Sequence, residues 1–313
     1  MAENNNLDNK KWYDDNDLDN SIFISSRVRL ARNFKSYPFS ITLNHQKYAN
    51  EIIQKTVDAV KLSGDKFKFI NASDISDIER LSNFERHNIS QYFLKDQNPR
   101  GFLINDSESL SVMINEEDHI RIQSICSGDN IQKAFELSDN MDDILAKKID
   151  YAFDDDFGYL TSCPTNVGTG LRASFMLHLP MLEKTSQLKD LIQIISKFGM
   201  TVRGIHGEGT KPMGSIYQIS NQITLGKTEQ DIIKNLQNVT QQIIEQELRL
   251  RESAIREKKL EFEDKTSRSF GILTNCKKID TNEATSLLSD VKLGYCMGFD
   301  LPKFKSNIYK IMM

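Results

Sequence analysis

The chain has 313 residues, of which 39% are hydrophobic and 27% charged, a composition typical of folded proteins and unlike disordered or fibrous ones. Forty Lys and Arg residues stand against 44 Asp and Glu residues, so the formal net charge is −4, which disfavours a dedicated nucleic-acid binder. No apolar run reaches the ~18 residues of a membrane span, and four cysteines without C-x-x-C spacing indicate a reducing cytoplasm rather than a disulfide or zinc framework.

Residues 1–20 contain six Asn and six acidic residues but few apolar ones. Such a segment rarely supports a packed core, so we expect a flexible acidic tail over 1–20. Trp12 and Tyr13 are its candidate docking points on the body.

Residues 22–30 alternate between two chemical types, which indicates a strand with an apolar and a cationic face. The apolar parity holds Ile22, Ile24, Val28 and Leu30, and the polar parity holds Ser25, Arg27 and Arg29.

The later elements can be placed by periodicity and by turn residues. In chain order they are a helix over 45–63 ended by Gly64, a hairpin of Phe102–Ile104 and Leu110–Ile114, a strand around Ile120 and Ile122, a helix over 130–148, a strand over 171–179, a helix over 186–198, a glycine-rich loop over 201–214, a strand over 215–226, and a long helix opened by Thr228 and Asp231. Strands dominate the middle and helices the end. The fold class is therefore α+β, an antiparallel β-sheet flanked by helices.

Three familiar motifs are absent. Gly226–Thr228 resembles the end of a phosphate-binding P-loop, but position 221 is Asn where that motif requires Gly. Asp156–Gly158 spells the D-F-G of protein kinases without a preceding H-R-D. The five His residues lack metal-binding spacing, so no metal site is expected.

Arginines on polar strand faces or beside glycines are the informative chemistry. They are Arg27, Arg29, Arg121, Arg172 and Arg203. A guanidinium is costly to bury without a partner, and its fork suits phosphate oxygens. The alternative is five surface arginines paired with some of the 44 acids, and composition alone does not decide between the two.

Four strings in order resemble the phosphagen (guanidino) kinase superfamily and, more closely, the bacterial protein-arginine kinases of the McsB family. They are ISSRVRLARN, NEEDHIRIQ, GYLTSCPTNVGTGLRAS and VRGIHGEG, with ERHNIS at 85–90 as a looser match. The resemblance implies a phosphagen-kinase-like catalytic domain over 21–245 and a small helical C-terminal domain over 246–313.

The resemblance also assigns roles to individual residues. Its ATP-binding set is Ser25, Ser26, Arg27, Val28, Arg29, His87, Arg121, Arg172, Ala173, Ser174, Phe175, Met176, Arg203, Gly204, Ile205, His206, Gly207 and Glu208. Glu117 would bind the guanidinium as the base, Glu208 would be the second carboxylate, and Cys163 the reactive cysteine beside the guanidino group. ATP would bring Mg²⁺ on its phosphates, because no protein cage for the ion is evident.

The chemistry agrees with these roles. Phosphoryl transfer needs positioned cations, and an arginine acceptor with a pKa of ~12.5 needs carboxylates to orient it and accept its proton. Each residue also has a structural reading. Glu117 could be only an ion-pair partner of Arg121, Glu208 could tune its loop, Cys163 could be a packing residue, and His87 could be structural.

Two departures from the small-guanidino kinases favour a protein substrate. Only 24 residues precede Ser25, where those kinases carry a helical domain, and Met176 stands where they carry His. The sequence therefore predicts an ATP-dependent protein-arginine kinase. The alternatives are a kinase of free arginine or another small guanidino compound, and a non-catalytic adaptor that binds phosphoarginine or a repressor.

The resemblance also implies partner proteins and a cellular location. It implies a bacterial, cytoplasmic stress-response and protein quality-control enzyme that acts on unfolded proteins or a transcriptional repressor, with an activator protein, the Clp protease machinery and a homodimer as further expectations. Membrane and direct nucleic-acid partners are not expected. The R-D-x-x-R-A motif that binds phosphoarginine in the closer family is missing, so allosteric sensing is not predicted.

Overall fold

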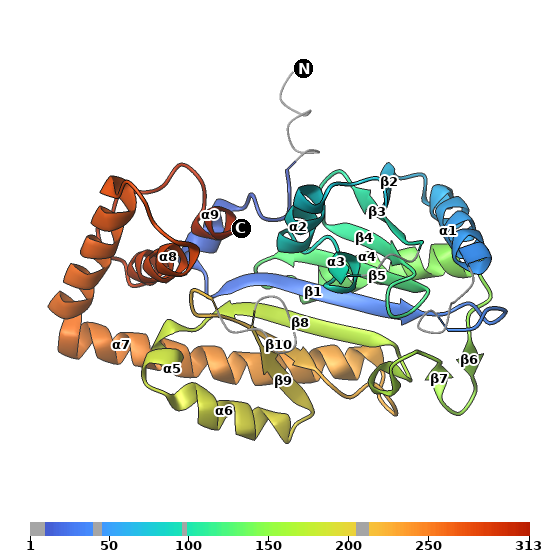
Figure 1. Cartoon of the computed structure of the whole chain (residues 1–313). Helices are drawn as coiled ribbons and strands as arrows, with labels where there is room; N and C mark the ends of the chain where they lie inside the picture. The colour runs from blue at the N-terminus through green and yellow to red at the C-terminus, as the bar shows by residue number, and fades with distance from the viewer. Residues whose placement is uncertain (1–9, 40–45, 96–98, 205–212) are drawn as a thin grey trace, which may run out of the picture.

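The computed structural model describes residues 10–39, 46–95, 99–204 and 213–313. Its centre is an eight-stranded antiparallel sheet in the order β2-β3-β4-β5-β1-β8-β10-β9 (Figure 1). The strands are β1 (Phe23–Arg32), β2 (Phe67–Asn71), β3 (Gly101–Asn105), β4 (Leu110–Ile114), β5 (Ile120–Ser127), β8 (Leu171–His178), β9 (Met200–Arg203) and β10 (Ile216–Asn221). A separate hairpin joins β6 (Phe153–Asp154) to β7 (Gly158–Tyr159).

One face of the sheet packs against helices. Helix α4 (Ile131–Ala146) contacts β1 and β5, α1 (Gln46–Val60) contacts α4, and the first part of α7 (Glu229–Asn275) contacts β8 and β10. Alternate strand residues such as Val28 and Phe175 meet Leu236 of α7 in one hydrophobic core. Burying this surface supplies most of the folding free energy of such a layer.

Described helices cover part of the opposite face. Helices α2 (Asp77–Glu85) and α3 (Tyr92–Lys95) lie over β3 and β4, where Phe93 packs against Phe102 (Figure 1). The short helices α5 (Pro180–Lys184) and α6 (Gln187–Ser196) flank the β9 side of the sheet. Among the described residues no helix is long and apolar enough to cross a membrane.

The C-terminal region is helical, as expected. Helix α7 is interrupted at Lys258 (φ −139°, ψ 30°), and its second part packs against α8 (Thr281–Cys296), which contacts α9 (Ile308–Met312). Figure 1 shows these helices at one end of the molecule, beside the start of β1.

Several local predictions are confirmed. The first helix and its 3-10 extension end at Gly64, whose φ of 74° suits glycine. Thr228 accepts a hydrogen bond from the Asp231 N–H at the start of α7. The hairpin β3–β4, the strands β5, β8 and β10 and the α+β class also agree.

Two details are corrected. Residues 201–203, expected in a loop, belong to β9, because they pair with β10. Ile24, expected on the apolar face, packs with Ile125 and Met176 on the face that carries Arg27. The reason is a register shift between Phe23 and Ser25, which moves the residue across the sheet.

Residues 10–22 form an ordered segment, which we call the N-terminal strap. Trp12, Tyr13 and Leu18 are buried, and the Lys292 ammonium donates to the carbonyl oxygens of Leu18 and Ser21. The flexible tail expected over 1–20 is therefore wrong for the strap, because its acids and carbonyls serve as partners for the C-terminal helices. The docking of Trp12 and Tyr13 is confirmed, and residues 1–9 lie outside the described residues.

Candidate active site

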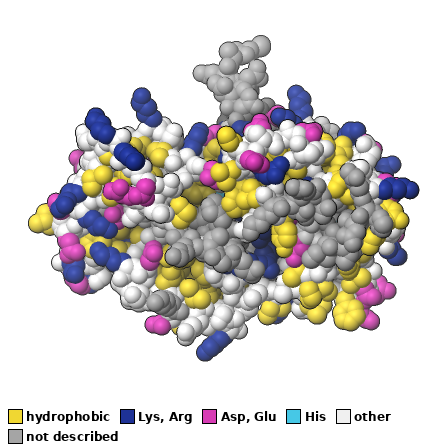
Figure 2. Space-filling view, in the orientation of Figure 1, with side chains coloured by type: hydrophobic (Ala, Val, Ile, Leu, Met, Phe, Trp, Pro, Cys, Tyr) yellow, Lys and Arg dark blue, Asp and Glu magenta, His cyan; other side chains and the backbone are white. Residues whose placement is uncertain are grey.

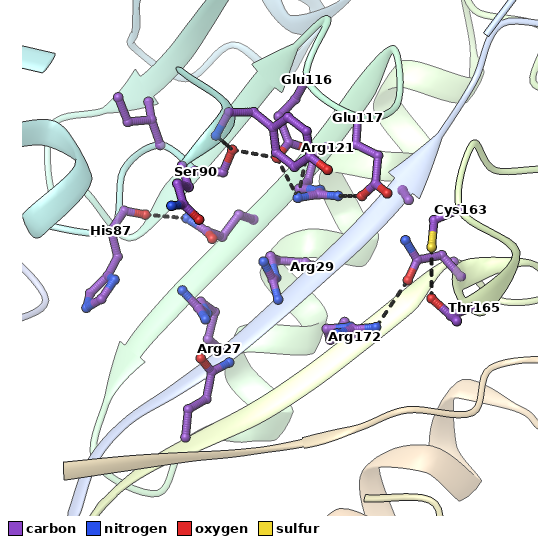
Figure 3. Close-up of a pocket in the computed structure, with 18 of the residues that line it drawn as sticks. Arg27, Arg29, His87, Ser90, Glu116, Glu117, Arg121, Cys163, Thr165 and Arg172 are labelled. Atoms are coloured by element: carbon purple, nitrogen blue, oxygen red, sulfur yellow. Dashed lines mark hydrogen bonds and ion pairs between the residues drawn. The ribbon is translucent and has the colours of Figure 1, made fainter. Parts of the chain in front are cut away.

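A pocket of about 580 Å³ lies on the sheet face opposite α4 (Figure 3). Its floor is formed by alternate residues of β1, β5, β8 and β10 and its rim by the segments around α3 and Cys163. The lining residues are Arg27, Arg29, Ala31, Phe84, His87, Ile89, Ser90, Gln91, Tyr92, Glu116, Glu117, Arg121, Gln123, Cys163, Thr165, Asn166, Gly170, Arg172, Arg203 and Gln218. Outside it, charges of both signs are interspersed over the visible face (Figure 2).

All five arginines singled out in the sequence line this pocket. They converge because β5, β1 and β8 are neighbours in the sheet: Arg29 is the cross-strand partner of Arg172, and Arg121 pairs with Ala31. Two like charges placed directly opposite each other are unfavourable on their own. Figure 3 shows Arg27, Arg29, Arg121 and Arg172 along one continuous floor.

Arg27 and Arg29 have mainly cationic neighbours, although the charge of Glu116 acts on Arg29. Within the described ranges neither forms an ion pair. Burial lowers the pKa of Arg27 to about 10, and the nearby Arg121, Arg172 and Arg203 add to the effect. Burial and the charge of Arg27 likewise place the pKa of Arg29 well below its ordinary value. An unneutralised cationic floor of this kind is suited to a polyanion.

Arg121 lies in the opposite environment. Its guanidinium contacts Glu116 at 2.7 Å and Glu117 at 2.8 Å. Burial lowers the pKa of Arg121, but Glu116, Glu117 and Asp118 outweigh it, and the net direction is upward. Arg121 thus holds two carboxylates at the edge of the cationic floor. The side chain of Glu117 is 18% exposed and that of Glu116 fully buried, so Glu117 is the more accessible of the two carboxylates that line the pocket.

The string NEEDH folds into a turn that divides its residues between scaffold and pocket. Asn115, at a φ of 57°, donates from Nδ2 to the carbonyl oxygens of Ala49 and Pro99. Asp118 accepts from Asn33 Nδ2 and from the Ser162 N–H, both at 2.7 Å, which ties this turn to the loop that carries Cys163.

His119 completes the scaffold. Its Nδ1 accepts from the Phe34 N–H at 3.1 Å, and its Nε2 donates to the Pro38 carbonyl at 2.8 Å. Burial lowers the pKa of His119 to about 4, so the ring is neutral. Asn115, Asp118 and His119 therefore position Glu116 and Glu117 without lining the pocket themselves.

Ser90 is a pocket residue that sequence reasoning missed. Its Oγ donates to Glu116 Oε1 at 2.5 Å and accepts from the Tyr92 N–H at 3.3 Å. The bond links the α2–α3 segment to the carboxylates on Arg121. Glu116, Tyr92 and Gln123 were missed as well. The only available signals were the place of Glu116 beside Glu117 and of Ser90 at the end of ERHNIS.

Cys163 lies at the end of the pocket nearest Glu117, as Figure 3 shows. Its Sγ is 3.0 Å from Thr165 Oγ1, and Asn166 Oδ1 accepts from Arg172 at 3.4 Å. The loop approaches backbone closely: a Cβ on Gly168 would lie 2.7 Å from the Thr224 carbonyl oxygen, and one on Gly170 would lie 2.7 Å from the Ala31 carbonyl oxygen. These contacts explain why this turn contains glycines.

The remaining expected site residues separate into three groups. Val28, Ala173 and Phe175 point into the core on the other side of the sheet, because they have the opposite parity to the arginines. Ser25, Ser26, Ser174, Met176 and Gly204 do not line the pocket; Ser26 Oγ is bonded to Gly128 and Asn130. Ile205, His206, Gly207 and Glu208 lie outside the described residues.

Family comparisons divide the chain into two matched parts. The family described as ATP:guanido phosphotransferase, C-terminal catalytic domain, matches residues 49–250. The family described as protein-arginine kinase McsB C-terminal domain matches residues 259–313. The second match begins one residue after the interruption of α7 at Lys258.

Curated relatives match nearly the whole chain. A protein-arginine kinase of Halothermothrix orenii is 45% identical over 288 residues, covering 92% of this chain and 82% of that protein. A protein-arginine kinase of Clostridium acetobutylicum is 43% identical over 303 residues, covering 95% and 89%.

Solved structures share the fold. The duplicated taurocyamine kinase of Schistosoma mansoni, with transition-state analogue components bound, has a TM-score of 0.66 and 30% identity over 77% of this chain and 35% of its own length. A lombricine kinase has a TM-score of 0.65 and 26% identity, covering 73% of this chain and 66% of that one. The phosphagen-kinase-like fold expected from the sequence is confirmed.

Proposed function

The chain belongs to the protein-arginine kinase family of ATP:guanido phosphotransferases, and we propose that its pocket transfers the γ-phosphoryl group of ATP to arginine side chains of proteins. One structural observation supports placing this reaction in the pocket. A floor of arginines, two of which form no ion pair with any described residue, ends at a carboxylate pair and a partly exposed thiol. The arginine floor suits a triphosphate, and the end with the carboxylates and the thiol suits a guanidinium.

The donor occupies the arginine floor in this proposal. Arg27 and Arg29 would bind the phosphates together with Arg172 and Arg203, and His87, which lines the same pocket, would face the nucleoside. ATP supplies the anion that lowers the mutual repulsion of these groups. Because the arginines are fixed by the sheet before the nucleotide arrives, they stabilise charge on the transferring phosphoryl group with little reorganisation.

The acceptor guanidinium lies between Glu117 and Cys163. Glu117 orients the planar cation, and a nitrogen lone pair of the guanidinium attacks the γ-phosphorus as the bond to the ADP oxygen breaks. An N–P bond forms, ADP leaves with the electron pair, and Glu117 accepts the proton of the attacking nitrogen. Thr165 and Asn166 hold the Cys163 loop at this end. The role of Glu208 as second carboxylate stays a prediction.

Mg²⁺ is proposed to enter on the nucleotide. Among the described residues no group of three or more His, Cys, Asp or Glu side chains could hold a metal ion. Mg²⁺ in such enzymes is commonly bound through substrate phosphates with few protein ligands, so the pocket is compatible with it without a cage. None of the steps above depends on a protein-bound metal.

The test is to incubate the full chain with Mg·ATP and either an unfolded arginine-containing protein or free arginine, and to quantify acid-labile phosphoarginine. The expected result is label on the protein. Label confined to free arginine would favour the small-guanidino alternative, to which the taurocyamine and lombricine kinase folds correspond. Phosphoarginine binding without any transfer would favour the adaptor.

The cellular setting is proposed from the family. The substrates are arginine-bearing proteins, among them unfolded proteins or a transcriptional repressor, in a stress response. An activator protein, the Clp protease machinery and a homodimer remain predictions. A cytoplasmic location is also a prediction, with which the four unpaired cysteines are compatible.

A further inference from the structure

An aromatic cluster lies behind His87, at the end of the pocket away from Glu117. It brings together Trp12 of the N-terminal strap and Tyr309 of α9. Tyr309 Oη is 3.0 Å from His87 Nε2, and the Trp12 ring centre lies 5.7 Å from that of Tyr309 and 6.4 Å from that of His87. Trp12 and Tyr309 are buried, and neither lines the pocket. They therefore contact the pocket wall from behind.

The backbone of His87 is held in an uncommon conformation. Its φ is 63°, a region that residues other than glycine rarely adopt. Its N–H donates to the Phe84 carbonyl at 2.9 Å, and its carbonyl accepts from Gln123 Nε2 at 2.6 Å. With the backbone fixed on both sides, the contact with Tyr309 contributes to how the imidazole ring is turned at the pocket wall.

Tyr309 is also close to the cationic floor. Burial raises the pKa of Tyr309, while the nearby Arg27 lowers it, and the net direction is upward. The phenol is therefore neutral and available as a hydrogen-bonding partner. The phenol is thus close to Arg27, which lies toward the His87 end of the cationic floor (Figure 3).

The N-terminal strap fixes the position of α9. Asn307 Nδ2 donates to the carbonyls of Tyr13 at 2.7 Å and Asp15 at 3.1 Å, and Asp19 Oδ1 accepts from the Ile308 N–H at 2.7 Å. Lys310 pairs with Asp14. The segment that carries Tyr309 is thus held against the catalytic face by several independent bonds, which gives the hydroxyl a defined position.

We propose that Tyr309 is a positioning residue for nucleotide binding: it orients His87 toward the nucleoside part of ATP and so makes that affinity depend on the C-terminal helices. The inference rests on the proposed function for the identity of the ligand. It goes beyond that function because it assigns a role in the donor site to a residue outside the pocket. The acceptor end, formed by Glu117 and Cys163, is not affected.

The experiment uses the full chain with Tyr309→Phe, which keeps the ring and removes the hydroxyl. Tyr295→Phe is the matched control, because its hydroxyl donates to the Pro302 carbonyl in the same helical region and Tyr295 does not line the pocket. Affinities for ATP, ADP and inorganic tripolyphosphate are measured by titration calorimetry. Since the assay does not require transfer, it distinguishes failure of this inference from failure of the proposed function.

Tyr309→Phe is expected to weaken the affinities for ATP and ADP about fivefold, which is the effect of one lost hydrogen bond. The affinity for tripolyphosphate should not change. Tyr295→Phe leaves all three affinities unchanged. In kinetic assays the KM for ATP rises, while the KM for the protein acceptor does not. Unchanged nucleotide affinity, or equal weakening of ATP and tripolyphosphate, would overturn the proposal.

A double-variant comparison gives a second test. His87→Asn tolerates the positive φ but is too short to reach Tyr309. In that background Tyr309→Phe is expected to have no further effect on ATP affinity. A full additional fivefold loss would show that Tyr309 acts independently of His87 and would contradict the assignment.

Discussion

Arg29 and Arg121 lie on neighbouring strands and on the same face of the sheet, yet their electrostatic environments are opposite. Arg121 is neutralised by Glu116 and Glu117, and its pKa is raised. Arg29 faces Arg172, and its pKa is lowered by burial and by its cationic neighbours. The difference indicates which arginine belongs to the folded scaffold and which requires a ligand.

The same comparison divides the pocket by chemistry. Where the cation is uncompensated, a polyanion is favoured. Beside Glu117, whose partly exposed carboxylate lines the pocket, a guanidinium is favoured. Under the proposed function, the phosphoryl donor and the arginine acceptor meet at the boundary between Arg29 and Glu117.

The largest effect is expected at Glu117. Glu117→Gln keeps the shape but removes the proton acceptor, so we expect phosphoarginine formation to fall about 10²- to 10⁴-fold, with nucleotide affinity retained. Initial rates on an unfolded protein and calorimetry with ADP measure the two quantities. Glu116→Gln is the matched variant; since Glu116 is fully buried, its loss in rate should be smaller. Equal losses at both positions would contradict the role given to Glu117.

Substitutions of Arg121 and Arg29 should affect the stability of the protein differently. Arg121→Met removes the cation that Glu116 and Glu117 share and is expected to lower the free energy of unfolding by about 3–5 kcal/mol. Arg29→Met removes a repulsive charge, so the free energy of unfolding of the ligand-free chain should stay unchanged or rise. The same variant should weaken the affinity for ATP about 10- to 100-fold. Denaturant unfolding checks both. If the Arg29→Met variant were destabilised but bound ATP normally, Arg29 would belong to the scaffold, which contradicts this account.

The scaffold residue His119 should make the stability of the protein depend on pH. The pKa of His119 is about 4 in the folded chain, against ~6.5 when unfolded, so the unfolded state binds the extra proton between these values. Stability is therefore lost as pH falls from ~6.5 toward 4, on the order of 3 kcal/mol from this group. His119→Gln should flatten this part of the profile. A constant difference between variant and parent over the range would exclude the effect.

Ser90 gives the smallest expected effect. Ser90→Ala removes the hydrogen bond to Glu116 and should lower the transfer rate by about threefold to tenfold, the equivalent of roughly 1 kcal/mol. The matched control is Ser82→Ala on α2, whose side chain does not line the pocket. If the two variants transfer phosphoryl groups at the same rate, Ser90 does not support the acceptor end.

The arginine floor could be predicted from the sequence because strand periodicity determines its geometry. Once Arg27, Arg29, Arg121 and Arg172 are on polar parities of strands, adjacency of β5, β1 and β8 brings them together. The same rule shows why Val28, Ala173 and Phe175 do not reach the pocket: a run assigned by motif includes both faces of a strand.

Long-range contacts could not be predicted in this way. The bond between His87 and Tyr309 spans 222 residues of sequence, and no local pattern indicates it. The register shift near Ser25, which moves Ile24 across the sheet, depends on pairing with β8. The acidic composition of the strap suggested solvation, whereas its side chains and carbonyls are partners for the C-terminal helices.

The most direct test of the central claim is a crystal structure of the chain with Mg·ADP. The account predicts that the phosphates lie within hydrogen-bonding distance of the guanidinium groups of Arg27 and Arg29, with Glu117 left facing the open acceptor end. Phosphates bound elsewhere, with Arg27 and Arg29 still without an anion, would contradict it.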